Sequence, residues 1–231
     1  MTRFLFALPL LLLSCAPEKS GAADDANAKP RLALLTSLPL VFGETFSIEP
    51  AGSPTLTRLQ RDYEVDAIAV ADAASLKGKP LLLMAHPLAQ PAEVLVELDQ
   101  WVRDGGRVML LADPKLSWPL ERPLGDRLRA PPAFADTGLL IHWGLLLEGP
   151  ITDGPTDAEV DGLAFRTSSP GRLRIEGGDC VLAGDGLVAR CSIGKGKATI
   201  IADADLLNVP DDVGKSPNLD LISKELARLS R

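Results

Sequence analysis

The sequence predicts an α/β fold in which a parallel sheet carries helices on both faces and an antiparallel β insertion follows late in the chain. Short runs of continuous apolar residues alternate with helical patterns in the first half of the chain, which is typical of parallel strands buried on both faces. From Val160 onward the pattern changes to short, hairpin-like strands. The last apolar strand and a closing helix return to the character of the first half.

The parallel strands are expected over residues 31–36, 65–71, 80–86 and 107–113. A helix is predicted over 53–62, because Ser53 can cap its first turn and Pro54 suits its first position. A second helix is predicted over 90–106, where apolar residues recur at helical spacing and two glycines end the pattern.

The second half of the chain is expected to be mostly antiparallel. Residues 114–155 are irregular and rich in proline, with a short helix and a strand expected within 138–150. Short strands are predicted over 163–169, 172–176, 179–184, 187–194 and 197–205, and a helix capped by Ser216 over 216–230. Together with the first half, this order of elements predicts a flavodoxin-like layer.

A disulfide is predicted between Cys180 and Cys191. Asp185-Gly186 lies between alternating apolar residues, which is a strong signal for a two-residue hairpin turn. Counting outward from that turn places Cys180 directly opposite Cys191, at a separation that suits a disulfide. If the chain is exported, as its amino terminus predicts, the pair lies in an oxidising compartment, where disulfides persist.

The amino terminus predicts a lipoprotein. Residues 1–14 form a signal peptide with a charged start and an apolar run too short for a membrane-spanning helix. The run ends at Leu12-Leu13-Ser14-Cys15, which resembles a bacterial lipobox and implies lipidation of Cys15. Residues 15–30 are small and charged, as expected for the lipidated cysteine and a flexible tether. This predicts a palmitate-bearing anchor in the cell envelope that faces the periplasm. In a Gram-negative cell, an Ala such as Ala16 directly after the lipidated cysteine resembles the sorting signal for the outer membrane.

The remaining residues, 31–231, are expected to form a single globular domain. The chain of 231 residues is 46% hydrophobic and 24% charged, and its net charge is −7. This acidic balance argues against nucleic acid as a partner and against electrostatic docking on anionic lipid.

Two segments resemble a known family. Residues 79–114 contain a strand, a loop with proline, a helix ending in Gly-Gly, a second strand and Asp-Pro. Residues 194–208 contain Gly-Lys-Gly, an apolar strand, two aspartates and an asparagine. Together they resemble the GldG-like auxiliary domain of uncharacterised ABC-type transport systems, which is related to the class I glutamine amidotransferase-like fold. The resemblance implies a non-catalytic envelope partner of a transport or surface machine.

Motifs that would carry enzyme chemistry are missing from the sequence. An amidotransferase-like enzyme needs a cysteine on a sharp turn after a core strand, where this chain has His86-Pro87 and Asp113-Pro114. No dinucleotide or Walker loop is present, and Gly194–Lys197 is expected to be a hairpin turn with two exposed lysines. Two histidines cannot build a three-histidine zinc site. We therefore expect no cofactor and no metal.

Six polar residues lie at the predicted carboxyl ends of the parallel strands, where open α/β sheets bind ligands. They are Thr36, Ser37, His86, Asp113, Asp203 and Asp205. The favoured interpretation is structural, with Asp113 closing a turn and Asp203 or Asp205 capping the following segment. Ligand binding is the first alternative. The second is a metal-dependent or acid/base hydrolase that uses this cluster.

Three tryptophans could form a sugar-stacking or partner-binding surface. Trp101 and the pair His142-Trp143 are expected in the core, whereas Trp118, in a proline-rich loop, could form an exposed contact patch. The sequence therefore favours an envelope lipoprotein that binds a protein partner or transporter component without catalysis, over a hydrolase at the strand ends.

Overall fold

The computed structural model describes residues 29–42, 52–210 and 215–231. The predicted signal peptide, the predicted lipidation site Cys15 and the predicted tether up to residue 28 lie outside the described residues. Within the described part, no helix is long and apolar enough to span a bilayer.

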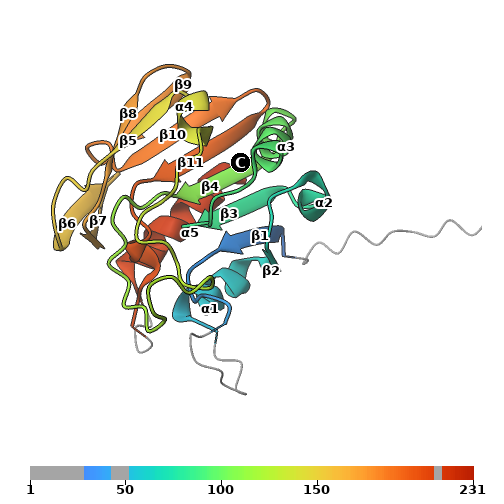
Figure 1. The fold of residues 1–231 in the computed structure, drawn as a ribbon. Helices are drawn as coiled ribbons and strands as arrows, with labels where there is room; N and C mark the ends of the chain where they lie inside the picture. Colours follow the sequence, from blue (N-terminus) through green and yellow to red (C-terminus); the bar gives the residue numbers. More distant parts are fainter. Residues whose placement is uncertain (1–28, 43–51, 211–214) are drawn as a thin grey trace, which may run out of the picture.

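A seven-stranded sheet forms the centre of the molecule, in the order β2-β1-β3-β4-β11-β10-β9 (Figure 1). Its parallel strands are β1 (Arg31–Thr36), β2 (Glu64–Ile68), β3 (Leu81–Ala85), β4 (Arg107–Leu111) and β11 (Gly196–Ile201). β10 (Val188–Ile193) and β9 (Asp179–Ala183) continue it in antiparallel pairing. The α/β class and the mainly parallel sheet are therefore confirmed.

Helices pack on the sheet in two groups. α1 (Pro54–Asp62) contacts α5 (Pro217–Leu229), and α2 (Ala73–Leu76) contacts α3 (Ala92–Arg103). α5 contacts β4 and β11, and α3 also contacts β11. Right-handed crossovers place α1 on one face of the sheet and α2 and α3 on the other. The sheet is therefore covered on both sides, and every residue of β3 is buried.

Two helix starts follow the predicted capping chemistry. The Ser53 hydroxyl accepts a hydrogen bond from the Leu56 amide at 3.1 Å, and the Ser216 hydroxyl accepts one from the Leu219 amide at 3.4 Å. Each cap is followed by proline at the first helical position. Proline loses no hydrogen bond at the first helical position, because an N–H there has no partner within the helix. The serine cap and the proline therefore favour the same helix start.

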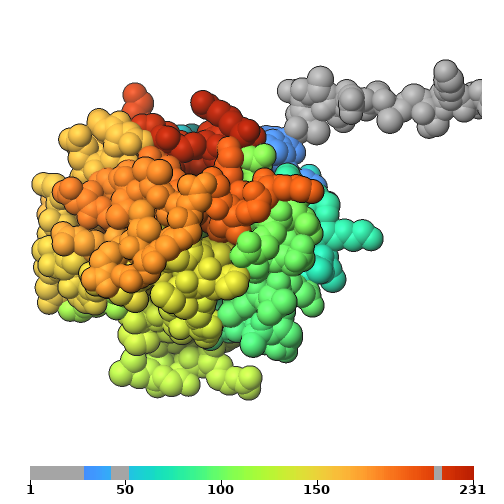
Figure 2. All heavy atoms as spheres, turned by 90° about the horizontal axis from the view of Figure 1, so that it is seen from above, coloured from blue at the N-terminus to red at the C-terminus, as the bar shows by residue number. Residues whose placement is uncertain are grey.

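The antiparallel part differs from the predicted insertion. The hairpin β9–β10 extends the main sheet, while β5 (Leu145–Glu148) pairs with β8 (Arg172–Ile175), and β6 (Pro155–Val160) pairs with β7 (Leu163–Ser168), as two small ribbons. These strands gather at one end of the molecule, yellow to orange beside the green α3 (Figure 2). The short helix α4 (Leu139–His142) precedes β5, as expected for 138–150.

The predicted hairpin and disulfide are confirmed. Cys180 lies opposite Cys191 in the β9–β10 register, their Cα atoms are 4.0 Å apart, and a disulfide joins them. Asp185 and Gly186 have φ angles of 54° and 89°. Positive φ at both central residues defines the turn type that matches the twist of a two-residue hairpin. The next turn, at Gly194-Lys195, also forms as predicted and leaves Lys195 and Lys197 exposed.

Two predictions for aromatic segments are wrong in part. Trp118 is half-buried and packs against the core, so it does not stand out as an exposed patch. Trp143 is buried as expected, with its indole N–H donating to Asp99 at 2.9 Å, but His142 is exposed beside the same carboxylate. Trp101 packs against the core, as predicted.

Candidate functional site

The six predicted strand-end residues fall into two groups rather than one. Thr36 and Ser37 end β1 and line a pocket there. Asp113, Asp203 and Asp205 meet beyond the ends of β4 and β11, and His86 follows β3. A single site built from all six residues is therefore not formed.

Both hydroxyls at the end of β1 are bound to backbone atoms of the β3 end. Thr36 Oγ1 donates to the Ala85 carbonyl at 2.9 Å and accepts from the Leu38 amide at 2.9 Å. Ser37 Oγ donates to the His86 carbonyl. These bonds connect the two chain segments that leave β1 and β3, so the hydroxyl protons are already used.

His86 occupies a sharp turn directly after β3. Its φ angle is 48°, a left-handed conformation that is uncommon outside glycine, and its side chain is completely buried. Nε2 lies 2.9 Å from the Pro131 carbonyl, so this nitrogen carries the proton and donates it. Burial lowers the pKa of the imidazole. The ring is therefore held neutral within the protein, away from solvent.

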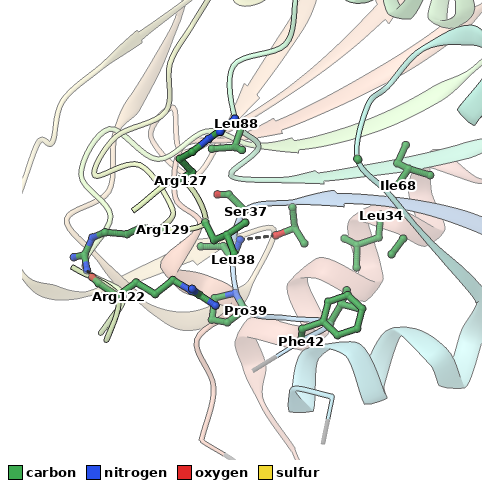
Figure 3. Close-up of a pocket in the computed structure, with 15 residues that line it drawn as sticks. Leu34, Ser37, Leu38, Pro39, Phe42, Ile68, Leu88, Arg122, Arg127 and Arg129 are labelled. Carbon is green, nitrogen blue, oxygen red and sulfur yellow. Dashed lines mark hydrogen bonds between the residues drawn. The ribbon is translucent and has the colours of Figure 1, made fainter. Parts of the chain in front are cut away.

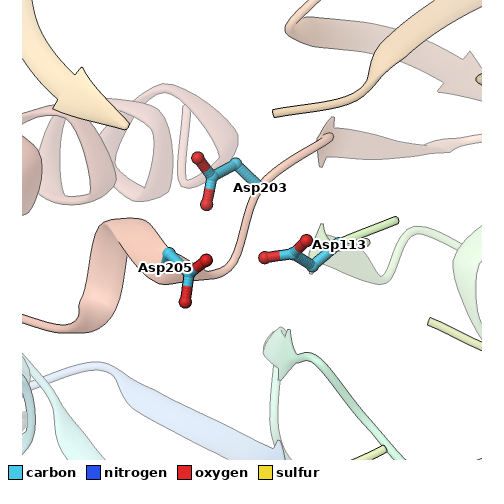
Figure 4. Close-up of side chains that lie close together, drawn as sticks. All are labelled: Asp113, Asp203 and Asp205. Atoms are coloured by element: carbon cyan, nitrogen blue, oxygen red, sulfur yellow. The ribbon is translucent and has the colours of Figure 1, made fainter. Parts of the chain in front are cut away.

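The carboxylates of Asp113, Asp203 and Asp205 point toward one another (Figure 4), with one oxygen of each lying within 4.8 Å of the others. All three side chains are buried. Like charges this close oppose joint ionisation. Burial, with the neighbouring Asp113 charge, raises the pKa of Asp203 well above its usual value and that of Asp205 to about 6. Burial also raises the pKa of Asp113.

Backbone amides surround the three carboxylates. Asp113 accepts from the amides of Lys115 at 2.8 Å and Ala204 at 2.9 Å, Asp203 from those of Ser168 at 3.1 Å and Leu206 at 3.3 Å, and Asp205 from that of Ser117 at 2.8 Å. The predicted turn at Asp113 and cap at Asp203 are thus both present. The cluster ties together three loops that are distant in sequence.

The same cluster could in principle offer oxygens to a hard cation. Among the described residues, Asp205 Oδ1 has no hydrogen-bond partner. The three carboxylates have six oxygens, the lower end of the six to eight that calcium usually takes, and five of the six already accept backbone amide protons. Loop anchoring is therefore the chemistry that this arrangement performs best.

A pocket of about 510 Å³ lies at the carboxyl ends of β1 and β2 (Figure 3). Apart from Thr36 and Ser37, its described lining is apolar or basic, and the basic residues are Arg122, Arg127 and Arg129. Sequence reasoning missed these residues. The signal that could have found them is the stretch Glu121–Ala130, ERPLGDRLRA, which carries three arginines and two leucines in an acidic chain.

No protein-family model and no curated protein matches the chain. Solved structures that resemble it include the mmIFT52 N-terminal domain, with a TM-score of 0.58 and 12% identity over 87% of this chain and 97% of that one. The cytoplasmic protein STM3548 of Salmonella typhimurium gives 0.54 and 10% over 86% and 98%. Gan42B, a GH42 β-galactosidase from G. stearothermophilus, gives 0.51 and 16% over 88% and 30%.

These likenesses show a shared α/β fold. The chain spans about a third of the length of the glycosidases that it matches. At identities of 10–16% the neighbours assign no activity to this chain.

Proposed function

We propose that this protein is a lipid-anchored envelope protein that works by binding, as a non-catalytic accessory component of an ABC-type transport or surface-associated system. We further propose that its fold is of the flavodoxin-like, class I glutamine amidotransferase-like kind, within the GldG-like group. The order of the five parallel strands supports the fold proposal, because the first connection runs to one side of β1 and all later ones run to the other.

The observation that carries the non-catalytic proposal is His86. It occupies the sharp turn after β3 where an enzyme of this fold would need its cysteine nucleophile. Its ring is buried and bonded to the Pro131 carbonyl. Both cysteines of the described residues, Cys180 and Cys191, are joined in a disulfide. The turn geometry is present, therefore, without a thiol to use it.

The envelope location rests on the lipobox at Cys15 and on the disulfide, which suits an oxidising compartment. A lipobox cysteine carries more than one acyl chain, and two such signals give stable anchoring. The protein then faces the periplasm on a tether, and an outer-membrane address is the version we propose for a Gram-negative cell.

The first test labels growing cells with radioactive palmitate and compares the native chain with Cys15→Ala. We expect label on the native chain alone. Crosslinking in intact cells should then join the protein to a membrane subunit of an ABC transporter. Equal labelling of both chains would remove the anchor from the proposal. Glutaminase or esterase activity that is lost in His86→Gln would refute a non-catalytic role.

A second candidate function is a metal-dependent or acid/base hydrolase, favoured by the convergence of Asp113, Asp203 and Asp205. Thermal unfolding with and without Ca²⁺, Mg²⁺ or Mn²⁺ separates the two candidates. An enzyme centre predicts that one of the ions raises Tm in the native chain and fails to do so in Asp203→Asn. Loop anchoring predicts no change with any of them.

A further inference from the structure

The pocket beside Thr36 lies near the point where the strand connections reverse their direction across the sheet. The chain leaves β1 toward β2 on one side, and then crosses to β3 on the other. The two connections diverge at the carboxyl ends of β1 and β3, which is where open parallel sheets form a ligand crevice. Thr36 ends β1 and Ser37 follows it, Ala69 follows β2, and Leu88 lies in the segment after β3; all four line this pocket. The pocket therefore lies at the carboxyl ends of β1 and β2 and borders this crevice through Leu88.

The walls of the pocket are apolar, and several extend into solvent. Phe42, Leu88 and Leu128 line it while being 81%, 48% and 71% exposed. Such exposed large apolar side chains are costly when gathered at one opening, and a gathered patch of this kind marks a binding surface. Since the Thr36 and Ser37 hydroxyl protons are bound to backbone carbonyls, the floor offers little polarity to a ligand.

The mouth of the pocket is cationic. Its described lining includes three arginines and no acidic residue, although the whole chain has a net charge of −7. Arg129 donates to the carbonyls of Leu120 and Arg122, and Arg122 lies 3.6 Å from the Asp126 carboxylate. Arg127 is exposed at the mouth, and Figure 3 shows it with Leu88 at one side of the pocket and Phe42 at another.

We propose that this pocket binds a small amphipathic anion, an acyl chain with a carboxylate head. The chain would lie against Leu34, Leu38 and Ile68, and the carboxylate would meet Arg127. A guanidinium fork matches the geometry of a carboxylate, and a pocket of about 510 Å³ lies in the range that encloses ligands of this size. The proposal stands on the pocket alone and is independent of the transport role.

The test uses photocrosslinking of the full lipidated chain in phosphatidylcholine nanodiscs. The probe is a dodecanoic acid that carries a diazirine on its chain, and peptide mapping locates the adducts. We expect adducts on segments 34–42 and 120–129, competed by dodecanoate and not by acetate. Arg127→Gln should reduce them about tenfold, which corresponds to one charge-assisted contact, and Leu128→Glu should also reduce them. Both side chains are exposed, so the fold is preserved.

Arg166→Gln is the matched control, because Arg166 is a solvent-exposed arginine on β7, away from the pocket, and its adducts should equal those of the native chain. A dodecyl ammonium probe with the same diazirine should label the pocket at least tenfold less. Equal labelling by the two probes would overturn the proposal, as would full labelling in Arg127→Gln. Labelling by a diazirine phospholipid that dodecanoate does not compete would identify a membrane-docking face instead.

Discussion

At the residue scale, Asp205 is a buried carboxylic acid whose ionised form is poorly stabilised by its surroundings. One of its oxygens accepts an amide proton from Ser117, and the other has no partner among the described residues. Ionisation leaves this oxygen charged, poorly solvated and close to Asp113 and Asp203. The protonated form relieves this cost, which is why burial raises the pKa of Asp205 to about 6.

We expect Asp205→Asn to change how stability depends on pH. The folded pKa of Asp205 is raised, so its stabilising contribution is complete below the unfolded value of 3.8 and is lost as pH rises through about 6. Asparagine keeps a neutral side chain at every pH. The advantage of the variant over the native chain should therefore grow by about 2 kcal/mol from pH 4 to pH 8, as measured by urea unfolding.

The pKa of His86 is shifted in the opposite direction to that of Asp205, and His86 is present in both the native chain and the variant. Its folded pKa is lowered, so its contribution is present above the unfolded value near 6.5 and is lost as pH falls through the folded value. Because His86 is common to both proteins, its effect cancels in the difference between them. A difference that stays constant with pH would show that Asp205 ionises freely in the folded state.

At the element scale, the contact between α3 and β11 depends on a glycine. A Cβ built on Gly196 would lie 2.0 Å from the Val102 carbonyl oxygen and 2.3 Å from that of Gly106. Both neighbours are backbone atoms, which cannot move aside as a flexible side chain could. β11 could no longer lie at its present distance from the end of α3.

Gly196→Ala should therefore destabilise the protein by more than 3 kcal/mol, the range of severe packing changes. Gly177→Ala is the matched control, since a Cβ there has open space and its φ is not positive. Thermal unfolding should show a large fall in Tm for the first variant and about none for the second. Similar Tm values for both variants would contradict the close approach.

A buried ion pair connects the closing helix to the antiparallel part of the sheet. Arg190 on β10 donates to both oxygens of Glu225 on α5, at 2.9 and 2.6 Å, and the Glu225 side chain is completely buried. Arg190 also donates to Asp161, as does Arg228. Loss of the Glu225 carboxylate would leave the mostly buried Arg190 guanidinium with its contact to Asp161 and without its two bonds to Glu225.

We expect Glu225→Ala to cost about 3 kcal/mol in the free energy of unfolding, because it removes both Glu225 contacts of a mostly buried guanidinium and leaves Arg190 with Asp161 alone. The comparison is Asp157→Ala, whose exposed contact with Arg166 spans 4.0 Å and contributes less than about 1 kcal/mol. Urea unfolding of both variants checks this. Equal costs would mean that the Glu225 carboxylate is not needed where it lies.

At the scale of the whole molecule, membrane attachment is expected to be apolar rather than electrostatic. The chain is acidic, with a net charge of −7, so anionic lipid repels it and salt should not release it. We predict that a wash with 1 M NaCl leaves the protein in the membrane fraction, while Cys15→Ser moves it out. Release of the native chain by salt would point to a different kind of attachment.

Local signals explain which parts of the fold were predictable. Ser53-Pro54 and Ser216-Pro217 set helix starts through neighbouring atoms, and Asp185-Gly186 set the hairpin register in the same way. β6 was missed because PTDAEV is polar and half-exposed. The short α2 was missed because it spans only four residues, Ala73–Leu76, just after the end of the predicted strand 65–71.

The candidate site was harder to predict, because it depends on distance in space. All four predicted acidic and imidazole residues are buried at strand ends as expected, but nothing local separates them from Thr36 and Ser37. Arg127 lies some 90 residues further along the chain than Ser37 and reaches the pocket only through the folded loop. Sequence patterns indicate which residues share a face of one helix or strand, but they do not indicate which distant segments come together in the folded chain.

The cross-link between Cys180 and Cys191 lies on the outermost pair of strands. β9 is an edge strand, with Val181 65% exposed, and an open edge invites pairing with other chains. The covalent clamp prevents β9 from sliding or peeling away from β10. A copy in which this disulfide is reduced would lack the clamp, and its β9 edge would be free to pair with further copies and aggregate.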